Sequence, residues 1–95
     1  MAGGCMGPEA VQAAAQLLKV AGEPNRLAAL EAIGPGGEVG VRELAEALAV
    51  NPSALGHHTS VLKLAGLIEG GRKGAGSIYR LTGLGRKVLR FAQEL

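Results

Sequence analysis

The spacing of apolar residues along the chain predicts a series of short amphipathic helices. Residues 9–21 place their apolar side chains on one stripe, and Gly22 closes this pattern. Pro24 suits the first turn of a second helix, because its missing N–H group is not needed there. The glycine-rich segment 34–37 ends that helix, and residues 41–48 form a third, shorter one.

The next segment opens with a strong helix-start signal. Asn51 is a favourable N-cap, and the proline after it suits the first helical position. A helix is therefore predicted from Pro52 to about Ala65, ended by Gly66 in a left-handed conformation. We expect its buried residues to be Leu55, His58 or Thr59, Val61 and Leu62.

The period of the pattern changes after Ile68. Residues 68–72 and 77–81 flank the glycine-containing turn 73–76, and the second segment alternates between two faces, which predicts a β-hairpin. Thr82 is an N-cap for a last helix. Its apolar stripe is the most regular in the chain and consists of Leu84, Val88, Phe91 and Leu95.

This order of elements predicts a mainly α fold, a winged helix-turn-helix with five helices and a two-stranded β-hairpin as the wing. Residues 1–8 are expected to be a flexible N-terminal arm, and residues 9–95 a single domain. The chain has 95 residues, of which 16 are glycine and 16 alanine, and its only aromatic residues are Tyr79 and Phe91. A core built from such small side chains is thin, so we expect a second subunit to complete it.

Charge is distributed unevenly along the chain. Residues 1–50 contain three basic residues and six glutamates, a net charge of −3. Residues 51–95 contain seven basic residues and two glutamates, a net charge of +5. The second half is therefore where a polyanion is expected to bind.

Several classes of protein are disfavoured by composition. The single cysteine, Cys5, cannot form an intrachain disulfide, which favours a reducing, cytoplasmic location. No apolar run approaches the ~18 residues of a membrane span, and the first residues lack the pattern of a signal peptide. The chain contains no aspartate, no phosphate-binding Gly-x-x-x-x-Gly-Lys segment and no plausible nucleophile–base spacing, so an enzyme is not expected.

Three segments of the chain form a recognisable set: Glu23-Pro24-Asn25-Arg26-Leu27, residues 44–48 followed by 53–68 with the pair His57-His58, and Tyr79-Arg80-Leu81. In this order and spacing they resemble the ArsR/SmtB family of small bacterial repressors. The first segment is similar to the entry to that family's second helix, and the second resembles its helix-turn-helix. Tyr79-Arg80-Leu81 ends the second wing strand as family members do, and the match extends over about residues 10–95.

The resemblance implies a homodimer that binds an imperfect palindrome in double-stranded DNA and leaves it when an effector arrives. It also implies that the first and last helices join the subunits. The stripe on the last helix agrees, since so small a protomer offers it little to pack on; the alternative is that this stripe faces the core of one subunit. The expected interface residues are Val11, Leu18, Leu84, Val88, Phe91 and Leu95.

The DNA-binding residues are expected on the predicted helix 52–65 and on the hairpin. The first turn of the helix should enter the major groove, and the hairpin cations should lie against phosphates or in the minor groove. The alternatives are a solvated helix face and charges that protect a strand edge from aggregation. The candidate DNA contacts are Asn51, Ser53, His57, Ser60, Lys63, Arg72, Lys73 and Arg80.

No metal site or cofactor is predicted. Gly40 and Arg42 stand where many members of the family have a metal-binding Cys-x-Cys pair. A second metal site of the family uses aspartate and histidine on the last helix, and residues 82–95 contain neither. His57 and His58 point ~100° apart on a helix and cannot chelate one ion unaided, and we expect His58 to lie against the core with one nitrogen hydrogen-bonded. The sequence leaves open a metal ion at a non-standard site and a disulfide or soft-metal site shared between two copies of Cys5.

A second hypothesis belongs to a different class, a winged-helix protein-interaction module or co-regulator that needs a second protein for sensing or DNA binding. It is motivated by Ala54 and Gly56, which stand where the family often has Thr and Ser, and by an apolar Leu64 at an outward position. The sequence does not decide between repressor and activator, and it does not identify the operator or the effector.

Overall fold

The computed structural model of the chain describes residues 6–34 and 36–95. Within these ranges there are five helices and three strands, and the five helices and the hairpin follow one another in the predicted order. The first four helices agree with their predicted bounds to within about one residue, whereas α5 ends at Gln93 and leaves Leu95, the last residue of the predicted stripe, beyond the helix. The elements are α1 (Pro8–Ala21), α2 (Pro24–Ile33), β1 (Glu38–Gly40), α3 (Val41–Leu48), α4 (Pro52–Leu64), β2 (Ile68–Lys73), β3 (Gly76–Leu81) and α5 (Gly83–Gln93).

The wing has one strand more than the two that were predicted. Strands β2 and β3 form the expected hairpin, and β1 pairs with the other edge of β3, which gives an antiparallel sheet of order β1-β3-β2. Three residues are too few to show an alternating pattern, and Gly40 is one of them. Pairing with β3, which is remote in the sequence, is what makes this segment a strand.

Side chains at the helix ends carry out the capping roles that were predicted. The Asn51 side chain accepts a hydrogen bond from the amide of Ala54 at the start of α4, and Thr82 accepts one from the amide of Gly85 at the start of α5. Gly66 is left-handed, with φ of 79°, and the bonds from Gly66 N to Lys63 O and from Leu67 N to Leu62 O end α4 in a Schellman motif.

Residues 23–27, which resemble the start of the family's second helix, stabilise the corner between α1 and α2. The Glu23 carboxylate accepts a hydrogen bond from the amide of Arg26, which caps the N-terminus of α2. The Arg26 Nε atom donates to the Val20 carbonyl at 2.7 Å, which satisfies one carbonyl at the end of α1. These two residues therefore fix how α2 leaves α1.

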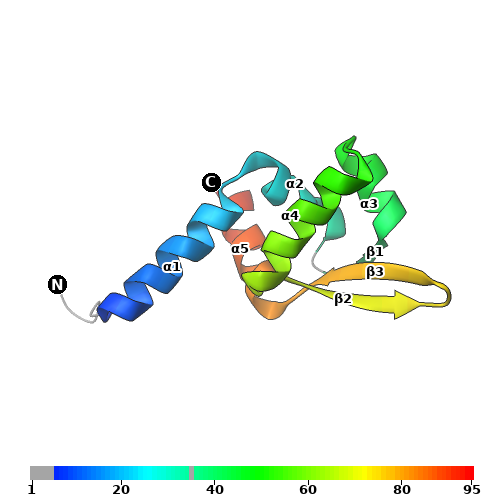
Figure 1. The fold of residues 1–95 in the computed structure, drawn as a ribbon. Helices are drawn as coiled ribbons and strands as arrows, with labels where there is room; N and C mark the ends of the chain where they lie inside the picture. The colour runs from blue at the N-terminus through cyan, green and yellow to red at the C-terminus, as the bar shows by residue number, and fades with distance from the viewer. Residues whose placement is uncertain (1–5, 35) are drawn as a thin grey trace.

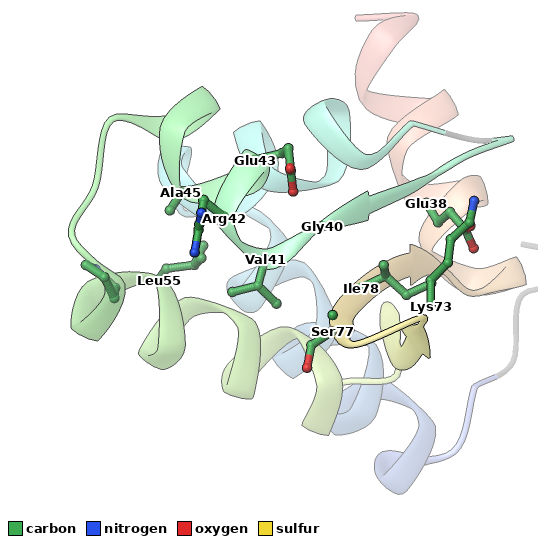
Figure 2. Close-up of a pocket in the computed structure, with 12 residues that line it drawn as sticks. Glu38, Gly40, Val41, Arg42, Glu43, Ala45, Leu55, Lys73, Ser77 and Ile78 are labelled. Atoms are coloured by element: carbon green, nitrogen blue, oxygen red, sulfur yellow. The ribbon is translucent and has the colours of Figure 1, made fainter.

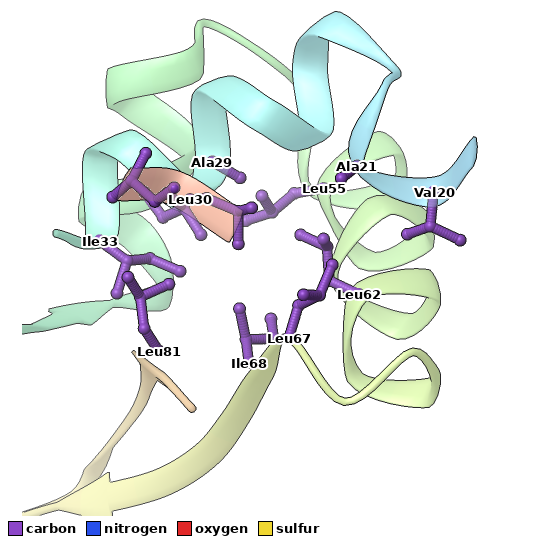
Figure 3. Close-up of a cluster of buried hydrophobic side chains, with 12 residues drawn as sticks. Val20, Ala21, Ala29, Leu30, Ile33, Leu55, Leu62, Leu67, Ile68 and Leu81 are labelled. Carbon is purple, nitrogen blue, oxygen red and sulfur yellow. The ribbon is translucent and has the colours of Figure 1, made fainter. Parts of the chain in front are cut away.

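The core lies between α2, α4 and the base of the wing (Figure 3). Leu30, Leu62 and Leu67 are fully buried in it, and Leu89 reaches it from α5. All members of this cluster are leucine, isoleucine, valine or alanine, and no aromatic side chain is among the buried residues of the described chain. This agrees with the thin core that composition predicts.

Helix α1 projects from the rest of the protein as an arm (Figure 1). Only its last two residues, Val20 and Ala21, are buried. The predicted flexible arm, residues 1–8, ends earlier than expected, since Pro8 already belongs to α1 and Gly7 is its N-cap; its first five residues lie outside the described ranges. No helix of the described residues combines the length and apolar character needed to cross a membrane.

Candidate nucleic-acid interface

The outward face of α4 is exposed to solvent and carries mostly small or polar side chains. Ser53, His57 and Ser60 lie about one turn apart along it, and all three are exposed. Gly56 lies between them and is exposed as well, while Leu64 at the end of the same face is 90% exposed. The side chains expected to reach DNA from α4 therefore share one accessible surface.

The opposite face of α4 is anchored to the core and to the wing. Leu55, Thr59 and Leu62 are buried, which selects Thr59 rather than His58 as the polar residue of the inner face. The Thr59 hydroxyl donates to the Leu55 carbonyl at 3.0 Å and accepts from the Tyr79 hydroxyl at 3.3 Å. This link between α4 and β3 fixes the wing relative to the helix, and no pattern in the sequence indicated it.

Lys63, a predicted DNA contact, has a neighbour on the wing. Its ammonium nitrogen lies 5.8 Å from the centroid of the Tyr79 ring, at the outer limit of a cation–π contact. Its side chain is exposed. Lys63 therefore lies at the junction of α4 and the wing rather than on the outward face with Ser53 and His57.

The wing cations are divided between its two faces. Glu38 and Glu69 are both paired in register with Arg80, and residues in register share a face of the sheet. Lys73 lies four residues after Glu69 and therefore on the same side. We call Glu38, Glu69, Lys73 and Arg80 the ion-pair face.

The charges of the ion-pair face are in contact. Glu38 lies 2.9 Å from the Lys73 ammonium and 3.6 Å from the Arg80 guanidinium, and Glu69 lies 4.0 Å from Arg80. The hydrogen bond and charge of Lys73, assisted by Arg80, hold the pKa of the Glu38 carboxyl below its ordinary value. Glu38 is therefore ionised at neutral pH, and this face carries two positive and two negative charges.

Arg72 lies on the other face of the wing. It is paired with Ser77, which is two residues before Tyr79, so all three side chains share the face that contacts α4. Arg72 is exposed and takes part in none of the ion pairs found among residues 6–34 and 36–95. The structure thus places Arg72 on the face of the sheet that contacts α4 through Tyr79, and Lys73 and Arg80 on the other face, from which Lys73 and Glu38 border a groove beside the start of α4.

A groove of about 810 Å³ opens between the wing and the first turns of α3 and α4 (Figure 2). Arg42 lines it from α3, and Figure 2 shows this side chain directed toward the start of α4. In the sequence, Arg42 is notable only for standing where many family members have a metal-binding cysteine. Its place beside the N-terminus of α4 makes it a further candidate for a phosphate contact, because the amides at a helix N-terminus and a nearby guanidinium both attract phosphate.

The hydrogen bond expected at His58 is not formed by its Nδ1 atom. This atom is buried without a hydrogen-bond partner, and the residue as a whole is half-buried. The ring of His57 lies 5.8 Å away and is tilted by 56°. Thr59 has taken the hydrogen bonds to the wing and to the α4 backbone, which leaves His58 beside the core but unpaired at this nitrogen.

In the part of the chain that the structure describes, no three histidine, cysteine, aspartate or glutamate side chains are close enough to hold a metal ion. Gly40 and Arg42 are adjacent to Glu43 in the groove, but a single carboxylate is not a chelating set. Cys5 lies outside the described residues.

The apolar stripes of α1 and α5 face away from the core of the protomer. Leu18 and Phe91 are each 59% exposed, and Val11, Leu84 and Leu95 are exposed too. Val88 is half-buried and packs against the core, beside the buried residues Gly85 and Leu89. The α5 stripe therefore contacts the protomer's own core only at Val88, and its other three members are exposed.

Comparison with known proteins agrees with this architecture. A curated, uncharacterised HTH-type transcriptional regulator of Methanocaldococcus jannaschii is 27% identical over 74 residues, which cover 78% of this chain and 83% of that protein. The homodimeric winged helix-turn-helix DNA-binding domain Mb0332 of Mycobacterium bovis, a possible ArsR-family regulator, superposes with a TM-score of 0.80 and 27% identity over 99% of this chain and 88% of its own. The transcriptional repressor BigR of Xylella fastidiosa gives 0.77 and 28% over 92% and 86%.

The family assignment rests on the helix-turn-helix itself. Residues 23–70, half of the chain, match the family described as bacterial regulatory protein, arsR family. They run from the Glu23 cap through α4 into the wing, and so include the outward face of α4 and its anchored inner face. The chain belongs to the ArsR family and is a winged helix-turn-helix transcriptional regulator rather than an enzyme.

Proposed function

We propose that this protein is a homodimeric repressor that binds a palindromic operator through α4 and the α4-side face of the wing. The observation that carries the proposal is that exposed Arg72 lies on the face of the wing that contacts α4, while Ser53 and His57 are exposed on the outward face of the same helix. A helix can present Ser53 and His57 to base edges only if nearby cations hold it against the backbone. Arg72 on the α4-side face of the wing and Arg42 in the groove beside the first turn of α4 supply such charges.

The N-terminus of α4 supports the same orientation. Backbone N–H groups in the first turn of a helix attract phosphate, and Asn51 leaves this turn free of negative charge. Gly56 adds to this, since a Cβ atom built there meets no atom within 4 Å and the fold therefore has no need of a glycine. We infer that glycine is useful here because the missing side chain lets the backbone of α4 approach the DNA closely.

The homodimer is supported by α1. A 14-residue helix is marginally stable by itself in water, and α1 has little packing beyond its last turn. A partner's helices would cover the exposed stripes of α1 and α5 and the apolar groove of about 350 Å³ between α2 and α5. The homodimeric M. bovis domain and the repressor BigR, both similar to this chain, support the dimer and the direction of regulation.

The test is DNA binding by the pure protein, with operators selected from a random pool and from the DNA that flanks its own gene. We expect His57→Ala to reduce discrimination between operator and random DNA. Arg72→Ala should weaken both and reduce the slope of log K against log salt by about 0.9 for each phosphate that is no longer neutralised. Arg90→Ala is the matched control, because Arg90 is exposed on α5 away from α4 and the wing; equal losses of affinity in Arg72→Ala and Arg90→Ala would contradict the proposal.

A co-regulator that needs a second protein is the other candidate, and Leu64 favours it. This leucine is 90% exposed at the end of the outward face of α4, where a charged side chain would be ordinary. A footprint produced by the pure protein, without any partner, would reject this second function.

A further inference from the structure

Glu38 places a negative charge on a wing that we propose to bind DNA. Two of the three wing cations, Lys73 and Arg80, lie within 4 Å of its carboxylate. The third, Arg72, is on the opposite side of the sheet. Glu38 comes from β1, the strand that was missing from the predicted wing, so the added strand brings this charge to the DNA-binding element.

A carboxylate and a phosphate are competing partners for the same cation. The Lys73 side chain is 74% exposed, so a phosphate can reach it, but the adjacent Glu38 carboxylate repels any phosphate that approaches. A phosphate must therefore compete with Glu38 for Lys73, so the paired lysine contributes less to phosphate neutralisation and to counterion release than an unpaired one would. With Glu69 on the same side, the ion-pair face has no net charge to offer a polyanion.

We propose that Glu38 is a specificity-determining residue that masks Lys73 and Arg80 and so suppresses binding to DNA of arbitrary sequence. This inference rests on the proposed function and adds to it. Non-specific affinity comes almost entirely from phosphate contacts, so masking two cations per protomer lowers it. Binding to the operator depends in addition on α4, so the ratio of specific to non-specific affinity rises.

The experiment compares wild type with Glu38→Gln on a selected operator and on a random duplex of equal length, by fluorescence anisotropy at several salt concentrations. Glutamine keeps the size of the side chain and removes its charge. We expect binding of the random duplex to tighten by about three- to tenfold and its salt slope to steepen by about 0.9 for each cation released. Operator binding should tighten less, so discrimination falls.

Two further variants isolate the ion pair from the general change in charge. Glu94→Gln removes the same charge from the end of α5, where Glu94 is exposed and outside the ion pairs found in the described chain; it should change random-duplex binding by less than about twofold. Lys73→Ala should have little effect in wild type and should cancel much of the gain in Glu38→Gln. Thermal unfolding of each variant establishes that it is folded.

The outcomes separate this inference from the proposed function. If wild type binds random DNA and operator but Glu38→Gln binds random DNA equally or more weakly, the masking role is wrong while DNA binding stands. Equal gains in Glu38→Gln and Glu94→Gln would also overturn it, because the effect would then be one of net charge. If wild type shows no salt-dependent DNA binding, both proposals fall together.

Discussion

Gly85 lies in the first turn of α5, at the point where this helix crosses the turn that follows α4. A Cβ atom at this position would overlap the backbone carbonyl of Leu67, which cannot move aside as a side chain would. The same carbonyl accepts a hydrogen bond from the amide of Thr82, and the Thr82 hydroxyl donates to the Gly66 carbonyl at 2.6 Å. The close approach of α5 to this turn therefore depends on one missing side chain and one hydroxyl.

We expect Gly85→Ala to lower the free energy of unfolding by about 2–3 kcal/mol, because α5 must shift away from the turn to admit a methyl group. Urea denaturation followed by circular dichroism measures the change. Gly83→Ala is the control, since a Cβ at Gly83 meets nothing within 4 Å, and it should stay within about 0.5 kcal/mol of wild type. Equal effects of the two substitutions would contradict the close approach.

Ala49 illustrates a different constraint on a single residue. Its φ of 55° is left-handed, and the bonds from its amide and from that of Val50 end α3 as a glycine normally would. The tight connection that the sequence predicts between α3 and α4 is thus achieved with a residue that prefers another conformation.

Among the elements, α4 combines an anchored inner face with an outward face that has no structural duty. Asn51 has a structural role and a proposed DNA-binding role. Its side chain accepts the hydrogen bond from the amide of Ala54, and it lies at the end of the helix that we propose to meet phosphate. An aspartate would cap equally well and add a negative charge. The two roles of Asn51 can therefore be separated.

We expect Asn51→Asp to keep the free energy of unfolding within about 0.5 kcal/mol of wild type and to weaken DNA binding at least about tenfold, since the new charge faces phosphate. Asn51→Ala should instead be less stable by about 1 kcal/mol because the cap is missing. Denaturation and DNA titration of both variants are the measurements. Wild-type affinity in Asn51→Asp would place the start of α4 away from the DNA backbone.

The wing shows how the pairing of strands redistributes chemistry. Sequence reasoning grouped Arg72, Lys73 and Arg80 as equivalent cations on a hairpin, and the hairpin itself was confirmed. Register divides them, because Arg72 faces α4 while Lys73 and Arg80 meet glutamates on the other side. Neither the third strand nor the position of Glu38 could be predicted from a three-residue segment.

The protomer taken as a whole is elongated, with extents of 50 × 24 × 24 Å, because α1 extends beyond the core. The apolar stripes of α1 and α5 are left without a partner in one chain. The shortage of bulky core residues and the exposure of these stripes have one common explanation, a second subunit that covers them.

We expect Phe91→Glu to convert a dimer into monomers, because a buried carboxylate in an apolar interface has no partner. Phe91 is 59% exposed in the protomer, so little of the protomer's own packing is affected. Light scattering after size-exclusion chromatography measures the mass, and far-ultraviolet circular dichroism establishes that the variant is folded. Leu64→Glu is the control, since Leu64 is exposed on α4 outside both stripes, and it should remain dimeric; a dimeric, folded Phe91→Glu would contradict the interface.

Local sequence was sufficient to specify the helices, their caps and the hairpin, because these depend on neighbours three or four residues away. Asn51, Gly66 and Thr82 could be placed in advance for this reason. The outward residues of α4 and the exposed stripe of α5 were also predictable, since helical periodicity fixes which side chains share a face. The family resemblance followed from the same local patterns.

Contacts between distant segments, by contrast, were settled only by folding. They added β1 to the wing, linked Thr59 to Tyr79 across 20 residues, and paired Lys73 with Glu38. Residues so far apart in the chain leave no periodic signal, and their contacts exist only once the core has closed around α2 and α4. The charge asymmetry visible in the sequence therefore became a wing with one neutral face and one cationic face only in the folded protein.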